Sequence, residues 1–316
     1  MPRTWIFRDG FGSGRGKGEE CKVQRAKVAV KERDSGAVAV GDDSVGDTGP
    51  FELGRVAAET FAAEIAHRPE LPSTNDWALE LARAGGHRLP LVVLASRQTQ
   101  GRGRGVNRWW SAPGALTFSL LLDSHAALPD IGALPQVSVV AALAACEALA
   151  TLVPGQPVGL KWPNDVLLGR RKACGILVES PARPPDRLVI GIGVNVNNSF
   201  AEAPEDVRQR AVSLADATGQ PLPLTDVLIR LLQAFERELT RLKAGRVPLS
   251  DACRPWCVLT GRAVAVNVGR ERIAGTCVGI GDDGALLVQT QTSLRRLSSG
   301  IVQAVGLVLD DQASRA

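Results

Sequence analysis

The stretch KWPNDVLLGRRKACGILVE occupies residues 161–179, and LVIGIGVNV follows at residues 188–196. Together with the run VGLKW at 158–162, these segments form short apolar runs bounded by turn residues, a pattern that favours β-strands. Gly191 and Gly193 lie inside the last run, and glycine inside a strand indicates that another group packs closely against the backbone. We therefore predict three strands here, with other groups lying over the glycines.

Helical periodicity is found on both sides of these strands. Ser73, three residues before an aspartate, approximates a capping box ahead of the run WALELARA, and the glycines at 85–86 give a stop signal. Residues 137–152 are apolar and alanine-rich, as expected for a buried helix. Residues 224–242 repeat apolar side chains at helical spacing, with Thr225 as the predicted N-cap.

Further strands are predicted at 91–96 and 115–122, with a short one at 61–67. After Trp256 the runs AVAVNV, RIAGTCVGI, ALLVQT and SLRRL alternate around turn signals. This pattern is typical of a small all-β barrel of about five strands. The sequence therefore predicts an α+β core with a mixed sheet, followed by a β-domain.

The composition is that of an ordinary globular protein: of 316 residues, 45% are hydrophobic and 22% charged, and the formal net charge is +4. That charge is too small to imply a nucleic-acid or membrane partner through bulk electrostatics. Six cysteines in a chain of this length favour reduced thiols and a cytoplasmic location over a disulfide scaffold. Cys253 and Cys257 form a single CxxxC, which favours two half-buried thiols over a metal site. Residues 131–153 contain proline, glutamine and glutamate, which favours a core helix over a membrane span.

Residues 1–50 differ from the rest of the chain. They carry nine basic and eight acidic side chains, show no sustained helical or strand period, and lack the apolar run of a signal peptide. They also lack the two amphipathic helices of a helix-turn-helix DNA-binding domain. We predict a disordered extension that binds no specific nucleic acid. The expected division is an extension at 1–50, a catalytic α+β domain at 51–255 and a β-domain at 256–316.

The segment 98–110, QTQGRGRGVNRWW, has the composition of a ligand-binding loop. Its glycines let the backbone approach a ligand closely, and its amides can cradle an anion. Arg102 and Arg104 offer permanent positive charge to carboxylate or phosphate oxygens, and the tryptophans give a flat apolar surface. An RNA-contacting Arg/Gly segment or a solvated turn has a similar composition, so the loop alone does not decide the function.

Polar groups at the strand ends are a second candidate set. Lys161 leads into Trp-Pro, which is unusual for a core, and Asn164 and Asp165 could read an amide or hold Mg²⁺ through oxygen ligands. Lys172 opens an apolar strand, which would place its ammonium at a pocket mouth. Asn195 could hydrogen-bond a base. A tight turn that closes a β-hairpin accounts equally well for the Pro-Asn-Asp sequence without any function.

The order and spacing of these segments decide between the readings. STN at 73–75, then the loop, KWPND, RKACGILVE and IGIGVNVN, resembles the catalytic domain of biotin–protein ligases. The likeness runs from about Leu71 to Thr240, and more loosely into the terminal β-domain. It implies a mixed sheet with packed helices, similar to class II aminoacyl-tRNA synthetases, followed by a small SH3-like β-barrel. It also implies an enzyme that uses ATP and Mg²⁺ to make biotinyl-5′-adenylate and transfers biotin to a lysine of a biotin carboxyl carrier protein domain.

The resemblance implies roles by position in this sequence. The biotin-binding positions are Ser73, Thr74, Asn75, Gln98, Arg102, Gly103, Arg104, Lys172 and Gly191. The ATP-binding positions are Arg102, Arg104, Trp109, Lys161, Asn164, Lys172 and Asn195. Catalytic roles fall to Lys172, Arg102, Arg104 and Asp165, the last in orientation or proton handling. No fixed metal site is implied, Mg²⁺ is expected to arrive with ATP near Asp165, and the protein is expected to be a monomer or homodimer.

The loop departs from the family pattern GRGRxGRxW, because Gly105, Val106 and Asn107 replace its later Gly-Arg pair. The alternatives are a lipoate- or octanoyl-transferring ligase of related fold, a bifunctional ligase and transcriptional repressor, and a non-catalytic biotin-binding protein. The first would need the lipoyl family's own glycine-rich lysine motif, which is not found, and the second would need a DNA-binding pattern at the N-terminus. Retention of Lys172 and both loop arginines disfavours the third.

Overall fold

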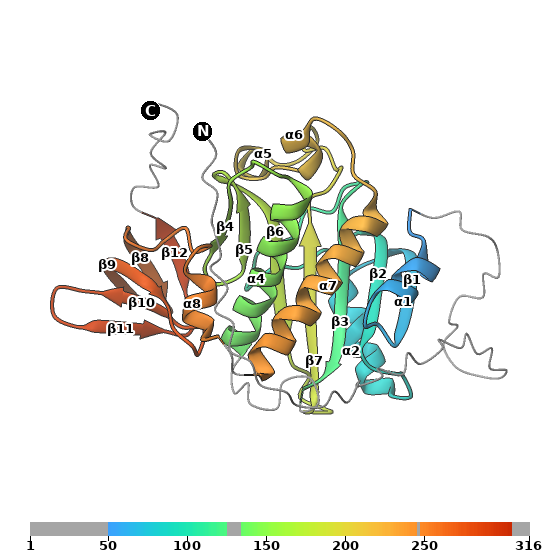
Figure 1. Cartoon of the computed structure of the whole chain (residues 1–316), viewed down its shortest axis with the longest axis horizontal. Helices are drawn as coiled ribbons and strands as arrows, with labels where there is room; N and C mark the ends of the chain where they lie inside the picture. The colour runs from blue at the N-terminus through green and yellow to red at the C-terminus, as the bar shows by residue number, and fades with distance from the viewer. Residues whose placement is uncertain (1–49, 125–133, 245–246, 305–316) are drawn as a thin grey trace, which may run out of the picture. The chain divides into compact units, whose positions relative to one another are not determined.

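A seven-stranded mixed sheet forms the centre of the structure, a computed structural model that describes residues 50–124, 134–244 and 247–304 (Figure 1). The strand order is β1-β2-β3-β7-β6-β5-β4. β1 and β2 run parallel, and every other neighbouring pair is antiparallel. The strands are β1 (Glu64–Leu71), β2 (Leu91–Gln98), β3 (Leu116–Asp123), β4 (Val158–Lys161), β5 (Asp165–Leu168), β6 (Arg171–Glu179) and β7 (Arg187–Val194).

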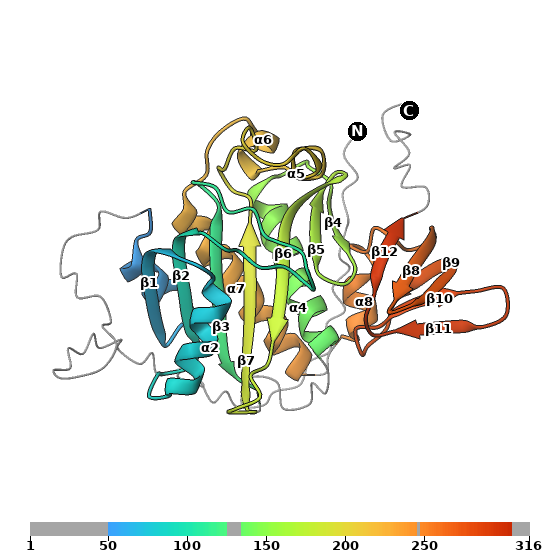
Figure 2. The same cartoon turned by 180° about the vertical axis from the view of Figure 1, so that it is seen from behind.

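Helices cover the two faces of this sheet unequally. The long helices α4 (Leu134–Leu152) and α7 (Leu224–Lys243) lie on one face, with the short α1 (Leu53–Glu59) beside them (Figure 1). On the opposite face lies α2 (Thr74–Ala84), seen in Figure 2. The remaining short helices are α5 (Glu205–Arg210), α6 (Leu214–Thr218) and α8 (Leu249–Cys253).

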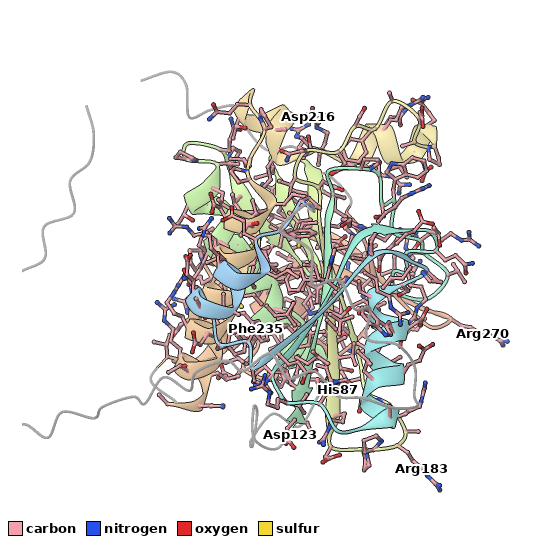
Figure 3. All side chains as sticks on the ribbon, turned by 90° about the vertical axis from the view of Figure 1, so that its right-hand side faces the viewer. His87, Asp123, Arg183, Asp216, Phe235 and Arg270 are labelled. Carbon is pink, nitrogen blue, oxygen red and sulfur yellow. The ribbon has the colours of Figure 1, made fainter. Side chains whose placement is uncertain are left out.

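The larger core lies between the sheet and the helix pair α4 and α7. α4 is apolar on almost every side because the sheet packs on one flank and α7 on another. By length and composition α4 alone among the described helices could span a bilayer, but 67% of its most apolar segment is buried inside the protein, as in a core helix. Side chains fill this layer, and Phe235 of α7 is labelled among them in Figure 3. Phe235 stacks on Phe61, with ring centroids 6.3 Å apart.

A smaller core joins α2 to the other face of the sheet. Ala78 and Ala82 of α2 pack on Leu91 and Val93 of β2, and these short side chains let the helix approach the strands closely. Ser73 caps the helix, since its hydroxyl accepts a hydrogen bond from the Asp76 amide at 3.4 Å. This places the N-terminus of α2 over the middle of the sheet.

The C-terminal segment forms a separate five-stranded antiparallel sheet with the order β11-β10-β9-β8-β12. Its strands are β8 (Ala263–Val268), β9 (Glu271–Ile280), β10 (Leu286–Gln289), β11 (Leu294–Leu297) and β12 (Ile301–Ala304). Backbone hydrogen bonds join Leu160 of β4 to Trp256 and Val258, just before this sheet begins. The buried Trp162 side chain donates from Nε1 to the Gly284 carbonyl, 2.9 Å away.

The main helices, the mixed sheet and the five-stranded β-domain are confirmed. One assignment was wrong: Pro223, not Thr225, occupies the N-cap of α7, and the Thr225 hydroxyl instead accepts from the Glu52 amide at 3.0 Å. The sequence patterns also missed β5 and the short helices α1, α5, α6 and α8, each of seven residues or fewer. The prediction for residues 1–50 lies outside the described residues, apart from residue 50.

Candidate active site

The N-terminus of α2 presents three buried polar residues to the sheet. Ser73, Thr74 and Asn75 are each only 3% exposed. The Thr74 amide donates to Oε1 of Gln98 at 2.6 Å, and the Thr74 hydroxyl lies 3.1 Å from the same oxygen. The structure therefore joins the predicted STN segment to the first residue of the glycine-rich loop.

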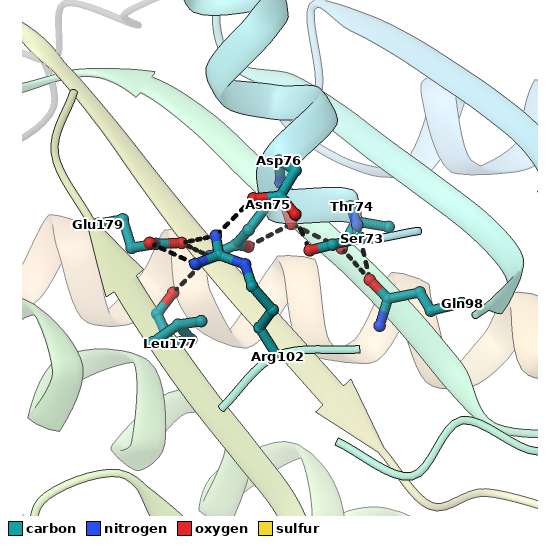
Figure 4. A network of polar contacts seen from close by, with 9 residues as sticks. Ser73, Thr74, Asn75, Asp76, Gln98, Arg102, Leu177 and Glu179 are labelled. Atoms are coloured by element: carbon teal, nitrogen blue, oxygen red, sulfur yellow. Dashed lines mark hydrogen bonds and ion pairs between the residues drawn. The ribbon is translucent and has the colours of Figure 1, made fainter. Parts of the chain in front are cut away.

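The Asn75 side chain is fixed on three sides (Figure 4). Its Nδ2 donates to the Leu177 carbonyl at 3.2 Å and to Glu179 Oε2 at 2.7 Å, while its Oδ1 accepts from the Ser119 hydroxyl at 2.6 Å. Gly191 lies directly beneath, because a Cβ added there would be only 2.1 Å from Asn75 Oδ1. Gly191, expected beside the ligand, thus makes room for the asparagine amide.

Sheet register explains why these partners meet. Ser119 of β3 pairs with Gly191 of β7, which pairs with Leu177 of β6. The three residues form one row across the sheet, with the Asn75 amide lying over the glycine in the middle. Ser119 is completely buried, so its hydroxyl is available only to Asn75 and Thr74.

The glycine-rich loop is anchored through Arg102. Its guanidinium makes a two-pronged contact with Glu179, with Nη1–Oε1 at 3.0 Å and Nη2–Oε2 at 2.6 Å. A third contact joins Nη2 to Asp76 Oδ1 at 2.8 Å (Figure 4). Two carboxylates therefore already balance the charge of Arg102 in this structure.

Trp109 covers the next row of the sheet. A Cβ on Gly193 would lie 2.5 Å from the Trp109 indole, and one on Gly175 would lie 3.3 Å from it. Lys172 Nζ is 5.8 Å from the centre of that ring and 2.6 Å from Asp165 Oδ1. The Trp109 Nε1 is buried and has no hydrogen-bond partner among the described residues. The loop tryptophan, the lysine and the aspartate are thus brought together.

Arg104 differs from Arg102 because only neutral oxygens contact it. Its Nη1 reaches Asn164 Oδ1 at 3.5 Å and the Gly300 carbonyl of the C-terminal sheet at 3.4 Å. The guanidinium is half-buried, and this burial lowers the pKa of Arg104. A half-buried cation without a carboxylate partner among the described residues is suited to receive an anionic ligand.

The other predicted residues have mainly structural contacts in this structure. Asn164 Nδ2 donates to the Ile176 carbonyl at 2.7 Å, and Asn195 Nδ2 donates to the Lys172 carbonyl at 3.2 Å. Gly103 donates its amide to the Asn107 carbonyl at 2.9 Å, which closes a turn within the loop. The Lys161 side chain makes no hydrogen bond or ion pair with any described residue, although its backbone pairs with Asp165 in the sheet.

The segment that departs from the family pattern forms the tip of the loop. Gly105 has a φ of +62°, and Asn107 Nδ2 donates back to the Arg104 carbonyl at 2.9 Å, so the turn is closed on itself. Val106 at the tip is 99% exposed. Sequence reasoning missed Glu179 and Ser119, although a serine inside the apolar run LTFSLLLD was a usable signal for the latter.

A cavity of about 530 Å³ lies at the Arg171 end of β6. Its lining includes Arg171, Asn198 and Ser213. Asn198 is 1% exposed and donates to Asn195 Oδ1 at 3.3 Å, but its own Oδ1 is buried without a partner among the described residues. In the part of the chain that is described, no three His, Cys, Asp or Glu side chains gather as metal ligands.

Comparison with protein-family models gives two matches. Residues 69–195 match the biotin/lipoate A/B protein ligase family, and residues 259–304 match the biotin protein ligase C-terminal domain. These two ranges hold the α2–β7 network and the five-stranded sheet, respectively. The order of the matches along the chain agrees with the order of the two folded parts.

Similar curated proteins are ligases. A biotin–acetyl-CoA-carboxylase ligase of Paracoccus denitrificans is 34% identical over 69% of this chain and 90% of the relative. The bifunctional ligase/repressor BirA of Bacillus subtilis is 30% identical over 78% of this chain and 75% of the relative. Among solved structures, the biotin protein ligase from Aquifex aeolicus in complex with biotin and ATP has a TM-score of 0.66 and 29% identity, covering 77% of this chain and 99% of that one. By fold, site and relatives, this chain belongs to the biotin protein ligase family.

Proposed function

We propose that this protein is a biotin–[acetyl-CoA-carboxylase] ligase, which activates biotin with ATP and transfers it to a lysine of a biotin carboxyl carrier protein domain. The observation that carries the proposal is the placement of two groups on adjacent rows of one sheet face. The Asn75 network lies over Gly191, and the Trp109–Lys172 pair lies over Gly193, two residues along β7. Such rows are roughly 7 Å apart, so a ligand's recognition end and its reacting end can be held together.

The biotin half of the site is proposed at the N-terminus of α2. Because Gln98 accepts from the Thr74 amide with Oε1, its Nε2 is left as a donor that no described residue uses. The ureido carbonyl of biotin requires such donors. We propose that Gln98, together with Ser73 and Thr74, reads the ureido ring, while Asn75 and the Gly191 row form the wall beside it.

The ATP half is proposed around Lys172 and Arg104. Trp109 gives a flat surface beside Lys172, and the cavity lined by Asn198, whose side chain contacts Asn195, is large enough for a purine base. Asn198 lines this cavity, and its Oδ1 is buried without a partner among the described residues. Asn164 and Lys161 lie at the end of the hairpin that carries Asp165 and complete the predicted nucleotide contacts.

The chemistry follows from the charges. A carboxylate oxygen of biotin attacks the α-phosphorus of ATP, the bond to the bridging oxygen breaks, and pyrophosphate leaves. Lys172, held by Asp165, and Arg104 neutralise the negative charge that accumulates between the two anions. The loop that carries Arg102 and Trp109 shields the mixed anhydride from water. The neutral ε-amine of the carrier lysine then attacks the acyl carbon and AMP leaves, so no protein nucleophile is needed.

Mg²⁺ fits this site only as a companion of ATP. Asp165 is the one carboxylate beside Lys172 among the described residues, and a single protein oxygen suits a Mg²⁺ ion whose other ligands are phosphates and water. When bound, the ion would supply further charge neutralisation to the phosphates. The described residues supply no separate all-protein metal cage.

The domain bounds, the location and the oligomeric state of the protein are also part of the proposal. A catalytic domain at 51–255 and a β-domain at 256–316 are supported by the separate family matches at 69–195 and 259–304. We further propose a cytoplasmic enzyme, monomeric or homodimeric, whose activity does not require sequence-specific DNA binding. Of the earlier alternatives, lipoate transfer is disfavoured by the C-terminal match and by relatives named for biotin.

One assay tests the proposal. The full-length protein is incubated with ATP, Mg²⁺, labelled biotin and a carrier domain, with a carrier lacking its target lysine as the control. We expect label on the carrier only when all components and the lysine are present. Labelled octanoate and lipoate are offered in parallel. Absence of biotin transfer, or transfer of lipoate in its place, would reject the assignment.

A further inference from the structure

Glu179, at the end of β6, connects two parts of the site that are far apart in sequence. Its carboxylate accepts from Asn75 of α2 and from Arg102 of the glycine-rich loop (Figure 4). These residues belong to different functional segments: Asn75 lies in the proposed biotin wall, and Arg102 anchors the loop that covers the reacting groups. The Glu179 side chain therefore holds both the proposed biotin wall, through Asn75, and the glycine-rich loop, through Arg102.

Both oxygens of Glu179 act as acceptors. Oε2 accepts from Asn75 Nδ2 at 2.7 Å and from Arg102 Nη2 at 2.6 Å, and Oε1 accepts from Arg102 Nη1 at 3.0 Å. A carboxylate can do this because it carries no donor. A glutamine cannot, since one of its two positions would place an NH₂ group against another donor.

The amide orientation of Asn75 depends on the same contact. Its Nδ2 faces Glu179 and the Leu177 carbonyl, which are both acceptors, so its Oδ1 must face the Ser119 hydroxyl. The Ser119 hydroxyl also lies 2.8 Å from the Thr74 hydroxyl oxygen, to which it can donate instead. Glu179 thus fixes the orientation of the Asn75 amide beside the biotin-facing segment.

We propose that Glu179 is a positioning residue that acts through Asn75 on biotin affinity and through Arg102 on retention of biotinyl-adenylate. The inference rests on the proposed function. Asp76, the other carboxylate on Arg102, makes a single contact at 2.8 Å and none with Asn75, so it does not couple the two segments. The coupling belongs to Glu179 alone among the described carboxylates of this network.

Two substitutions separate the two effects. In Glu179→Gln the amide oxygen can occupy the Oε2 position, which keeps Asn75 and one Arg102 contact but places NH₂ against Arg102 Nη1. Glu179→Ala removes all three contacts. Losing a hydrogen bond to a charged group costs on the order of tenfold in the affected equilibrium. We therefore expect Glu179→Gln to weaken retention of biotinyl-adenylate by the loop. We expect Glu179→Ala to weaken both adenylate retention and biotin affinity.

The experiment measures three quantities on the full-length enzyme: KM for biotin, KM for ATP, and adenylate escape, read as biotin label on a bystander protein. Glu179→Gln should raise escape about tenfold while KM for biotin stays within about threefold. Glu179→Ala should raise escape and raise KM for biotin on the order of tenfold or more. KM for ATP should stay within about twofold in both, a split that general loss of structure would not produce.

Glu70→Gln is the matched control, because it breaks an exposed Glu–Arg ion pair, Glu70–Arg97, on the neighbouring strands. It should leave all three quantities unchanged. If thermal melting shows that Glu179→Ala is unfolded, the adenylate escape measured for Glu179→Gln alone tests the inference. Wild-type escape in Glu179→Gln, or a parallel rise in KM for ATP, overturns the inference. A wild-type protein that loads no biotin onto the carrier rejects the proposed function instead.

Discussion

Gly191→Ala is expected to displace Asn75 and to weaken biotin binding far more than one methyl group would suggest. The added Cβ would lie 2.1 Å from Asn75 Oδ1 and 2.8 Å from its Cγ, whereas real Cβ contacts essentially never fall below 3.0 Å. The amide must therefore move by about 0.9 Å or the strand must shift. Either change stretches contacts that are now 2.6, 2.7 and 3.2 Å long.

The magnitude follows from those three hydrogen bonds. Two are to neutral partners, worth about 0.5–1.5 kcal/mol each, and the one to Glu179 is worth about 1.5–3 kcal/mol. Partial loss of all three destabilises this wall of the site by about 3 kcal/mol. Since biotin binding requires the wall in its wild-type geometry, we expect the biotin Kd to rise on the order of a hundredfold. We expect the fold to survive, since the displaced group lies at the surface of the sheet rather than between the sheet and α4.

Isothermal titration of biotin into the free enzyme measures this effect, with a thermal melt to check folding. Gly54→Ala is the control: nothing lies within 4 Å of the added Cβ, and the residue sits in α1. It should leave the biotin Kd unchanged and stabilise the protein by about 0.5–1 kcal/mol. A Gly191→Ala protein that binds biotin within threefold of wild type would refute the reasoning that an absent side chain positions Asn75.

Three further outcomes are expected. Lys172→Ala should lower the rate of pyrophosphate release by roughly a hundredfold to a thousandfold, because it removes the cation that Asp165 holds beside the phosphates; a near-normal rate would contradict this role. Arg104→Gly should let biotinyl-adenylate escape and label lysines of a bystander protein, and unchanged selectivity in that assay would count against it. Burial and the neighbouring Glu147 carboxylate raise the pKa of Glu238 from its ordinary 4.5 to about 7, so the folded chain holds a proton that the unfolded chain releases between these values. Stability should therefore fall as pH rises through this window, and Glu238→Gln should flatten the Tm profile between pH 5 and pH 8; an unchanged slope would refute the assignment.

The fold could be predicted wherever a pattern was long. The apolar period of α7 gave its range almost to the residue, 224–242 against 224–243. Short elements could not be predicted for the opposite reason. β5 has four residues, which are too few to show a period, so the sequence around it indicates only a turn or hairpin. Thr225 failed as a cap because a distant backbone amide, that of Glu52, took its hydroxyl, a contact no local pattern encodes.

The site was predictable as a set of segments but not as a set of contacts. STN, the loop, KWPND and the glycine strand are all recognisable, yet no local pattern pairs Asn75 with Ser119 or Arg102 with Glu179. Those pairs depend on strand register, which brings β3, β7 and β6 into line at one row. Register is set by the packing of the whole sheet, so it cannot be predicted from any one segment.

The Trp162–Gly284 contact has a consequence for anyone who wishes to design a smaller ligase. Trp162 is 1% exposed, and the acceptor for its indole N–H comes from the turn between β9 and β10. A fragment ending near residue 256 would remove that acceptor and leave the indole N–H to be satisfied by water. The minimal active unit must therefore retain the C-terminal barrel, and trimming should begin elsewhere.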